Sequence, residues 1–202
     1  MCQLNEYMLE TLTGQASIGS AMSPDVVTRH ADLWRLLDPS SRRLAAQIPV
    51  LLLDLNFLDE AWWRGVTSTS NTCPIDQGVQ SSGSHYWQPE LTRQVLMLAW
   101  PTVREDRVAA SLLFGMSDAV AAVIGSLTPQ QLDRVSLHYS DELRLRWAQC
   151  DAFWRGLLTA ALSADAEALR DTHLFGIQLL GGERMRAGGV CNRESTRRRL
   201  KQ

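Results

Sequence analysis

Residues 127–147, LTPQQLDRVSLHYSDELRLRW, align without a gap with residues 37–57, LDPSSRRLAAQIPVLLLDLNF. Two further blocks flank it, in the same order in both copies: DAFWRG (151–156) with EAWWRG (60–65), and ASLLFGMS (110–117) with ASIGSAMS (16–23). A period of about 90 residues is too long for a solenoid unit. The repeat therefore predicts a duplicated small domain, so that the chain folds as a dimer fused into one polypeptide.

The two copies are separated by a segment with the composition of a linker. Residues 66–90 hold five Ser, two Gly and two Pro, and they show no apolar periodicity. Trp87 and Tyr86 are unusual there, and we expect them to anchor the linker onto the body. The expected domains are repeat 1 (1–65), the linker (66–90), repeat 2 (91–182) and a C-terminal tail (183–202).

Most of the chain has the apolar spacing of helices, so we predict an all-α fold. Thr128, Pro129 and Gln131 provide an N-cap, a proline at the first helical position and a capping-box glutamine. Asp38 repeats the cap in the first copy, and Gly115 is typical of a helix stop. We expect helices at 91–100 (ending before Pro101), 104–114, 118–125 (capped by Ser117), 128–139, 151–162 and 164–180 (begun by Ser163 and stopped by Gly181 and Gly182).

One feature of each copy is not helical. Residues 143–147, LRLRW, and the matching residues 53–57, LDLNF, alternate with a period of two, which indicates a short half-buried strand. A lone strand cannot satisfy its backbone groups, but two equivalent strands can pair. We therefore predict a short antiparallel ribbon between the repeats; a helix end or an ordered loop is the alternative.

The charge of the chain is divided unevenly. Residues 1–182 carry 20 acidic and 13 basic residues, a net charge of −7, whereas residues 183–202 carry 7 basic and 2 acidic residues, a net charge of +5. Such asymmetry is typical of an interaction tail for nucleic acid or another anionic partner. The tail residues expected to contact DNA phosphates are Arg193, Arg197, Arg198, Arg199 and Lys201. The alternative is a solvated terminus without a partner.

Several classes of protein are not expected. No apolar run approaches the ~20 residues of a membrane span, and the N-terminus lacks the basic and apolar regions of a secretory signal. No nucleophile elbow, phosphate loop or zinc spacing is present, so we expect no enzyme, metal or cofactor. The cysteines are expected to be free thiols in a reducing cytoplasm, and they are Cys2, Cys73, Cys150 and Cys191.

The second copy resembles the FlhD family, one subunit of the bacterial flagellar master transcriptional regulator. Residues 96–136 carry the resemblance without a gap, and residues 143–147 match an apolar–basic stretch that follows in the family. The matching positions are Asp106-Arg107, Ala109-Ala110, Gly115, Ala121, Leu127-Thr128 and Gln131. The chain departs from the family in its duplication, in Pro101 within an expected helix, and in Leu143, where the family has a cysteine.

The resemblance implies two tandem helical domains that form an intramolecular pseudo-dimer with a helix-turn-helix-like element. It also implies a cytoplasmic regulator of transcription that acts with an FlhC-like partner, contacts DNA through the complex, and assembles further. A different hypothesis is an adaptor or anti-activator that captures a regulator without touching DNA, because a body of −7 would be repelled by DNA.

Three arginines within the body are further candidates for DNA contact. Arg134 lies in the candidate recognition helix 128–139, although a structural helix that binds protein is the alternative. Arg144 and Arg146 share one face of the expected strand and form either a basic strip or charge pairs with the other copy. The expected partner-binding residues are Asp106, Leu112, Trp63 and Trp154. For the tryptophans, packing between the repeats is the alternative.

Overall fold

The computed structural model describes residues 1–19, 23–69, 87 and 89–199, with the backbone alone for Thr69 and residues 188–199. Within these residues the chain is 77% helical, and its eleven α-helices are accompanied by a two-stranded sheet. The predicted all-α fold class is therefore confirmed. The helices pack around one continuous apolar core, whose largest fully buried side chains include Trp34, Trp63, Trp154, Phe57 and Phe114.

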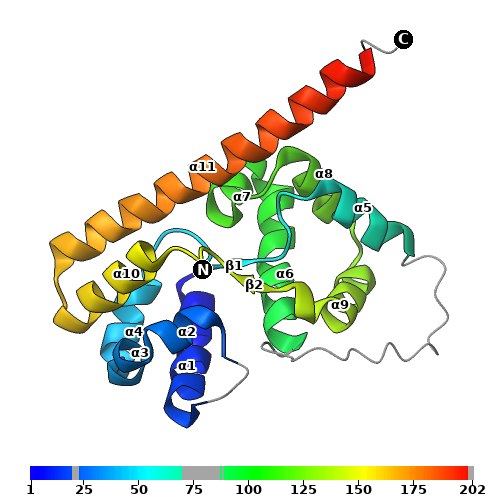
Figure 1. Ribbon diagram of the computed structural model, residues 1–202. Coiled ribbons are helices and arrows are strands. Elements are labelled where there is room, and N and C mark those ends of the chain that lie inside the picture. The colour runs from blue at the N-terminus through cyan, green and yellow to red at the C-terminus, as the bar shows by residue number, and fades with distance from the viewer. Residues whose placement is uncertain (20–22, 70–86, 88, 200–202) are drawn as a thin grey trace.

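The same order of elements occurs twice along the described chain: four helices, a short strand and a helix (Figure 1). The first series is α1 (Cys2–Ile18), α2 (Asp25–Arg29), α3 (Ala31–Leu36), α4 (Pro39–Ala46), β1 (Leu53–Asp54) and α5 (Glu60–Thr69). The second is α6 (Pro89–Glu105), α7 (Arg107–Phe114), α8 (Asp118–Ser126), α9 (Pro129–His138), a 3-10 turn (Ser140–Glu142), β2 (Arg144–Leu145) and α10 (Asp151–Ser163). A long helix, α11 (Ala166–Arg199), follows.

The predicted helix caps are present. The Asp38 carboxylate accepts a hydrogen bond from the Ser41 backbone N–H at 2.7 Å and so begins α4. Thr128 and Gln131 form a complete capping box at the start of α9. The Ser117 hydroxyl accepts from the Val120 N–H at the start of α8, and Gly115 ends α7 with a left-handed φ of 63°.

The predicted antiparallel ribbon also forms, between the two stretches that the repeat matched. Leu53 pairs with Leu145, and Asp54 pairs with Arg144. Each strand is only two residues long, because Asn56 (φ 50°) and Trp147 (φ 52°) turn the backbone into the left-handed region soon afterwards. The ribbon therefore fixes the register of the two halves but adds little hydrogen bonding.

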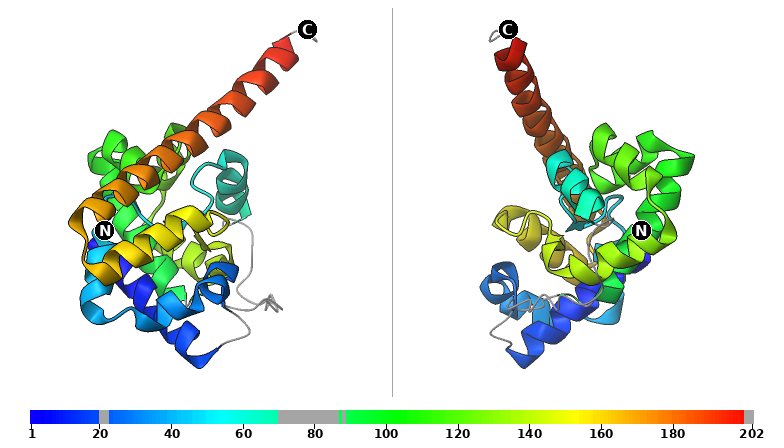
Figure 2. Two further views of the ribbon diagram at one scale, coloured as in Figure 1. Left: turned by 60° about the vertical axis from the view of Figure 1, so that its left-hand side comes forward. Right: turned by 90° about the vertical axis from the view of Figure 1, so that its right-hand side faces the viewer.

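The two series of elements exchange their last helices. Within the first, α1 packs on α3 and α4; within the second, α6 packs on α8 and α9. Beyond the ribbon the pairing crosses over, since α10 packs on α3 and α4 whereas α5 packs on α8. Each half of the chain therefore completes the core of the other. Figure 2 shows α10 beside the helices of the first half and α5 beside those of the second.

The prediction that a helix ends before Pro101 is wrong, because α6 continues through Pro101 to Glu105. Proline removes the hydrogen bond that would reach the carbonyl of residue 97. Pro101 lies on the exposed side of α6, and Met97 is 41% exposed, so water can satisfy that carbonyl. The core contacts of Leu96, Ala99 and Val103 hold the helix together across the proline.

Both predicted ends of the last helix are wrong. Ala164 (φ 51°) ends α10 in a left-handed conformation, and α11 begins only at Ala166. The Asp165 carboxylate caps it by accepting from the N–H groups of Glu167 and Ala168. At the other end α11 runs through Gly181 and Gly182 to Arg199.

The two glycines do not stop α11 because neither has a positive φ, and each costs a helix only about 1 kcal/mol. Leu180 and Glu183 hold the helix to the body on either side of them. In the expected linker, α5 extends to Thr69, so its first residues are helical. Trp87 is 4% exposed, which confirms that it packs onto the body, whereas Tyr86 lies outside the described residues.

Candidate functional site

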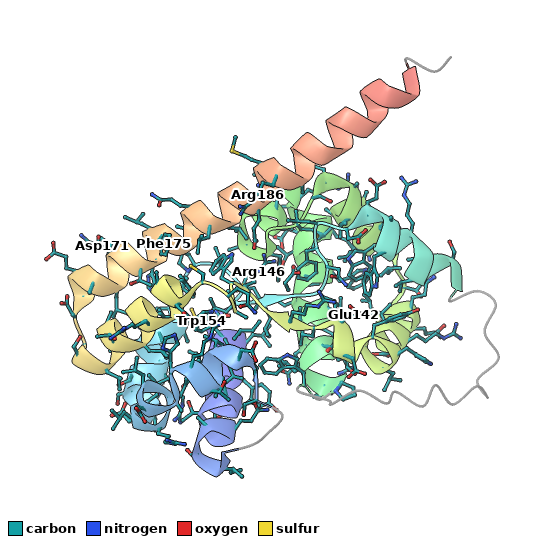
Figure 3. The ribbon with its side chains drawn as sticks, in the orientation of Figure 1. Glu142, Arg146, Trp154, Asp171, Phe175 and Arg186 are labelled. Carbon is teal, nitrogen blue, oxygen red and sulfur yellow. The ribbon has the colours of Figure 1, made fainter. Side chains whose placement is uncertain are left out.

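Arg146 lies at the centre of the molecule, where both halves meet α11 (Figure 3). Its side chain is only 2% exposed. The guanidinium donates to Asp54 Oδ1 at 3.0 Å, to Glu183 Oε2 at 3.1 Å and to the Leu53 carbonyl at 3.2 Å, and it also donates to the Phe114 carbonyl. A single side chain therefore joins β1, the end of α7, and α11.

Two partly buried carboxylates balance the charge of Arg146. The side chains of Asp54 and Glu183 are 28% and 29% exposed. Burial raises the pKa of Glu183 above its ordinary value, while Arg146 lowers this pKa and Asp54 raises it. Arg146 is thus a structural cation in the interior, and not the DNA-facing residue that the alternation of the strand predicted.

The other two body arginines remain at the surface. Arg144 is opposite Asp54 in the ribbon, as the charge-pair interpretation expected, but its guanidinium contacts Glu142 at 3.1 Å. Arg134 is exposed on α9, which also presents Leu137 to solvent. On the same helix Asp133 forms an ion pair with Arg93 at 2.9 Å, and the pKa of Arg93 is raised by that carboxylate. The outer face of α9 is therefore mixed in charge and partly apolar.

The tail residues extend the last helix. Arg193, Arg197, Arg198 and Arg199 lie on the last turns of α11, while Lys201 lies outside the described residues. Figure 2 shows this end of α11 running away from the packed helices in both views. A helical arm thus carries four of the predicted DNA-binding arginines away from the acidic body.

The prediction that two tryptophans bind a partner at the surface is wrong. Trp63 and Trp154 are both fully buried. Trp63 stacks on Phe57 with 6.5 Å between ring centroids, and the Trp154 indole N–H donates to the Arg146 carbonyl at 3.1 Å. For Trp154 the alternative interpretation, packing between the repeats, agrees with the structure, since its ring centroid lies 5.8 Å from that of Trp34 on α3. The contact of Trp63 with Phe57 lies within the first repeat.

Asp106 and Leu112 are both at the surface, around the corner between α6 and α7. The Asp106 carboxylate caps α7 by accepting from the N–H groups of Val108 and Ala109 at 2.8 and 3.0 Å. Leu112 is 58% exposed, and Val108, one turn before it, is 69% exposed. Residues four apart lie on one face of a helix, so these two apolar side chains form a patch.

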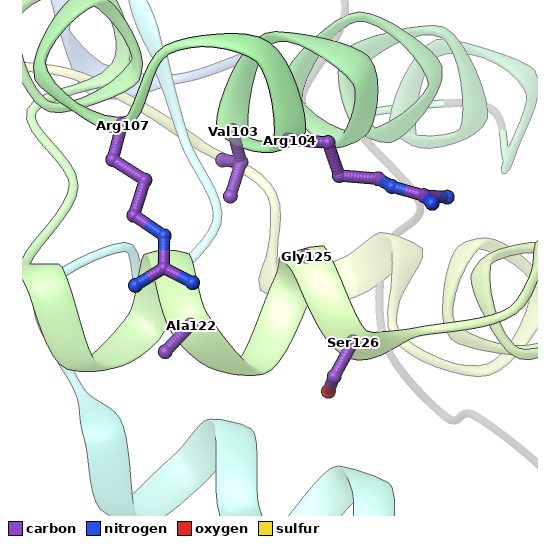
Figure 4. Close-up of a pocket in the computed structure, with 6 residues that line it drawn as sticks. All are labelled: Val103, Arg104, Arg107, Ala122, Gly125 and Ser126. Carbon is purple, nitrogen blue, oxygen red and sulfur yellow. The ribbon is translucent and has the colours of Figure 1, made fainter.

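A hollow of about 290 Å³ lies beside this corner, between the junction of α6 with α7 and the end of α8 (Figure 4). Arg104 and Arg107 border it, with Gly125 and Ser126 opposite. Neither arginine forms an ion pair with a carboxylate among the described residues. Arg104 instead lies over the ring of Trp100, 4.7 Å from its centroid. We call Arg104, Arg107, Val108 and Leu112 the α6–α7 surface.

The sequence pattern predicted Leu112 of the α6–α7 surface as a binding residue, but not Arg104, Arg107 or Val108. The spacing of Val108 and Leu112 indicates a helix but cannot show which face is covered. The structure buries the face of α7 that carries Ala110, Ser111 and Phe114, and leaves Val108 and Leu112 outside. Two arginines three residues apart, at positions 104 and 107, followed by the apolar pair would have been the available signal.

Other kinds of site are not assembled by the described part of the chain. No group of three or more His, Cys, Asp or Glu side chains there could hold a metal ion. No single described helix is long and apolar enough to cross a membrane, and only α7 and α8 taken together, bent by 112°, have that length and composition. Searches of family models, curated proteins and solved structures for relatives of this chain found no match.

Proposed function

We propose that this chain is a non-catalytic adaptor subunit that binds a partner protein through the α6–α7 surface. The proposal rests on the exposure of Val108 and Leu112, by 69% and 58%, on the helix that Arg107 begins. Arg107 and Arg104 border the neighbouring hollow, and neither has a carboxylate partner among the described residues. Isolated exposed apolar residues are common, but a pair on one helix face with a charged rim has the composition of an interface.

The chemistry of the surface defines the partner that fits it. Val108 and Leu112 would cover an apolar segment, and full burial of side chains of this size contributes roughly 1.5–3 kcal/mol each. Arg104 and Arg107 would pair with carboxylates at the edge of that segment, which adds selectivity and speeds association. The expected partner therefore presents an apolar helix or strand flanked by Asp or Glu.

A photo-crosslinking amino acid at position 112, introduced in the producing cells, tests this proposal. We expect a covalent adduct with one protein, which is lost when Arg104 and Arg107 are both changed to Glu. The matched control places the same amino acid at position 36, because Leu36 on α3 is 67% exposed and its neighbour Arg35 already forms an ion pair with Asp32. Equal capture from both positions, or no adduct from position 112, would show that the α6–α7 surface is not a binding site.

A second candidate, a transcription-regulator subunit resembling FlhD, is favoured by the end of α11. Its four arginines lie on a helical arm, and each DNA phosphate that they neutralise would release counterions. In that function an FlhC-like regulator bound at the α6–α7 surface supplies most of the DNA contact. The exchange of α5 and α10 supports the intramolecular pseudo-dimer that the resemblance implies, as each half needs the other for its core.

Gel-shift titrations across salt, with and without the crosslinked partner, separate the two functions. A regulator subunit gives a shifted complex whose affinity depends less steeply on salt when residues 188–202 are deleted. That truncation keeps Leu180 and Glu183, which hold α11 to the body. If a partner co-purifies but promoter fragments show no gel shift, only the adaptor function remains.

A further inference from the structure

The outer face of α11 carries an apolar stripe that the body does not cover. Leu174, Ile177 and Met185 are 53%, 45% and 81% exposed, whereas Leu180 and Gly176 on the opposite face pack against the body. Their spacing of three and eight residues keeps the exposed side chains on one side of the helix. This stripe is separate from the α6–α7 surface, which lies on other helices.

Gly181 lies in the middle of the stripe. A β-carbon at this position would have no atom within 4 Å, and the residue has no positive φ. An interior helical glycine costs about 1 kcal/mol relative to alanine. Neither a turn nor a close contact among the described residues requires a glycine at this position. A glycine in an exposed apolar stripe would, however, let a second backbone approach closely.

Ile177 and Met185 of the stripe lie symmetrically about Gly181, and this symmetry favours a copy of the same helix as the occupant. Ile177 lies four residues before Gly181, and Met185 lies four residues after it. We propose that α11 pairs with α11 of a second copy of this chain, antiparallel and centred on Gly181. In this arrangement Ile177 of each copy packs against Met185 of the other, and each glycine lies where the two helices cross.

The charges along α11 favour the antiparallel direction. Its first half carries Glu167 and Asp171 with a single arginine, whereas the half after Gly182 carries six arginines and two glutamates. An antiparallel pair places the basic end of each helix beside the acidic beginning of the other. A parallel pair would place the two basic ends together, and like charges in contact oppose association. Glu167 and Asp171 of one copy would therefore attract the arginines of the other and favour the antiparallel direction.

The oligomeric state of the full chain tests the pairing. Light scattering across a dilution series should give the mass of two chains at high concentration and of one at low concentration. Both Ile177→Glu and Met185→Glu should give single chains throughout, while the matched Leu36→Glu control behaves like the wild type. A single-chain mass at every concentration, or dimers that persist in both charged variants, would overturn the proposal.

Disulfide trapping tests the direction without adding charge to the stripe. In a background with the four native cysteines changed to Ser, Ile177→Cys and Met185→Cys chains are oxidised separately and as a mixture. Antiparallel pairing predicts a linked dimer only in the mixture, because each residue lies about 12 Å along the axis from its own copy. Linkage of each variant alone would show parallel pairing, and absence of linkage in the mixture would also overturn the proposal.

Discussion

The Arg146 guanidinium contacts the Asp54 carboxylate at 3.0 Å across the ribbon that joins the two halves of the chain. Arg146 follows β2, whereas Asp54 ends β1, so this ion pair joins segments 92 residues apart in sequence. Glu183 completes the cluster from α11. The arrangement of the halves and the docking of α11 therefore depend on one buried cation.

Replacing Arg146 with Met should lower the free energy of unfolding by about 3–5 kcal/mol, the range for breaking a buried ion pair from one side. The loss arises because Asp54, Glu183 and the Phe114 carbonyl keep their burial but lose their donor. Denaturant unfolding measures it, and Arg144→Met is the matched control. Arg144 is 67% exposed, so the control should change stability by less than about 1 kcal/mol. Equal effects of the two substitutions would contradict the role of Arg146.

Replacing Gly115 with Ala should also destabilise the fold, by about 2–4 kcal/mol. Its φ of 63° disfavours a side chain, and the added β-carbon would overlap with Leu180 Cδ1. Gly65→Ala is the control, because a β-carbon there meets no atom within 4 Å, and this variant should gain about 0.5–1 kcal/mol. Thermal or denaturant unfolding of both variants gives the comparison. A neutral Gly115→Ala would show that α11 does not dock against the end of α7.

The position of Glu183 predicts a dependence of stability on pH. Burial raises the pKa of this carboxyl in the folded state above 4.5, so the folded state binds its proton more tightly than the unfolded state does. The contribution of Glu183 to stability is then present at low pH, and it is lost as pH rises from about 4.5 through the raised pKa. The difference in unfolding free energy between wild type and Glu183→Gln should fall over that window and stay constant above it. A difference that grows with pH there would contradict the assignment.

The sequence predicted the local structure well, because local signals control it. Asp38 and Thr128 begin helices through side-chain bonds within three residues, and Gly115 ends one through its own φ. The ribbon was predictable because the repeat showed which two stretches are equivalent. The helix end predicted at Gly181 was wrong, because contacts of its neighbours with the body outweigh the low helix propensity of glycine.

The candidate site was less predictable, because exposure depends on packing across the whole chain. Arg146 alternates with Arg144 in the sequence, yet the former is buried and the latter is at the surface. Trp154 has the composition of an interface residue, but α10 carries it into the core of the first half. Val108 and Leu112 have the composition of core residues but lie outside, because α7 packs through its other face, which carries Ala110, Ser111 and Phe114.

Affinity for the isolated partner shows whether the α6–α7 surface binds protein. The measurement is a calorimetric titration of the partner trapped at position 112 with wild type, Leu112→Glu and Leu36→Glu. We expect Leu112→Glu to weaken binding at least tenfold, about 1.4 kcal/mol, and Leu36→Glu to bind like wild type. Unchanged affinity of folded Leu112→Glu would contradict the account.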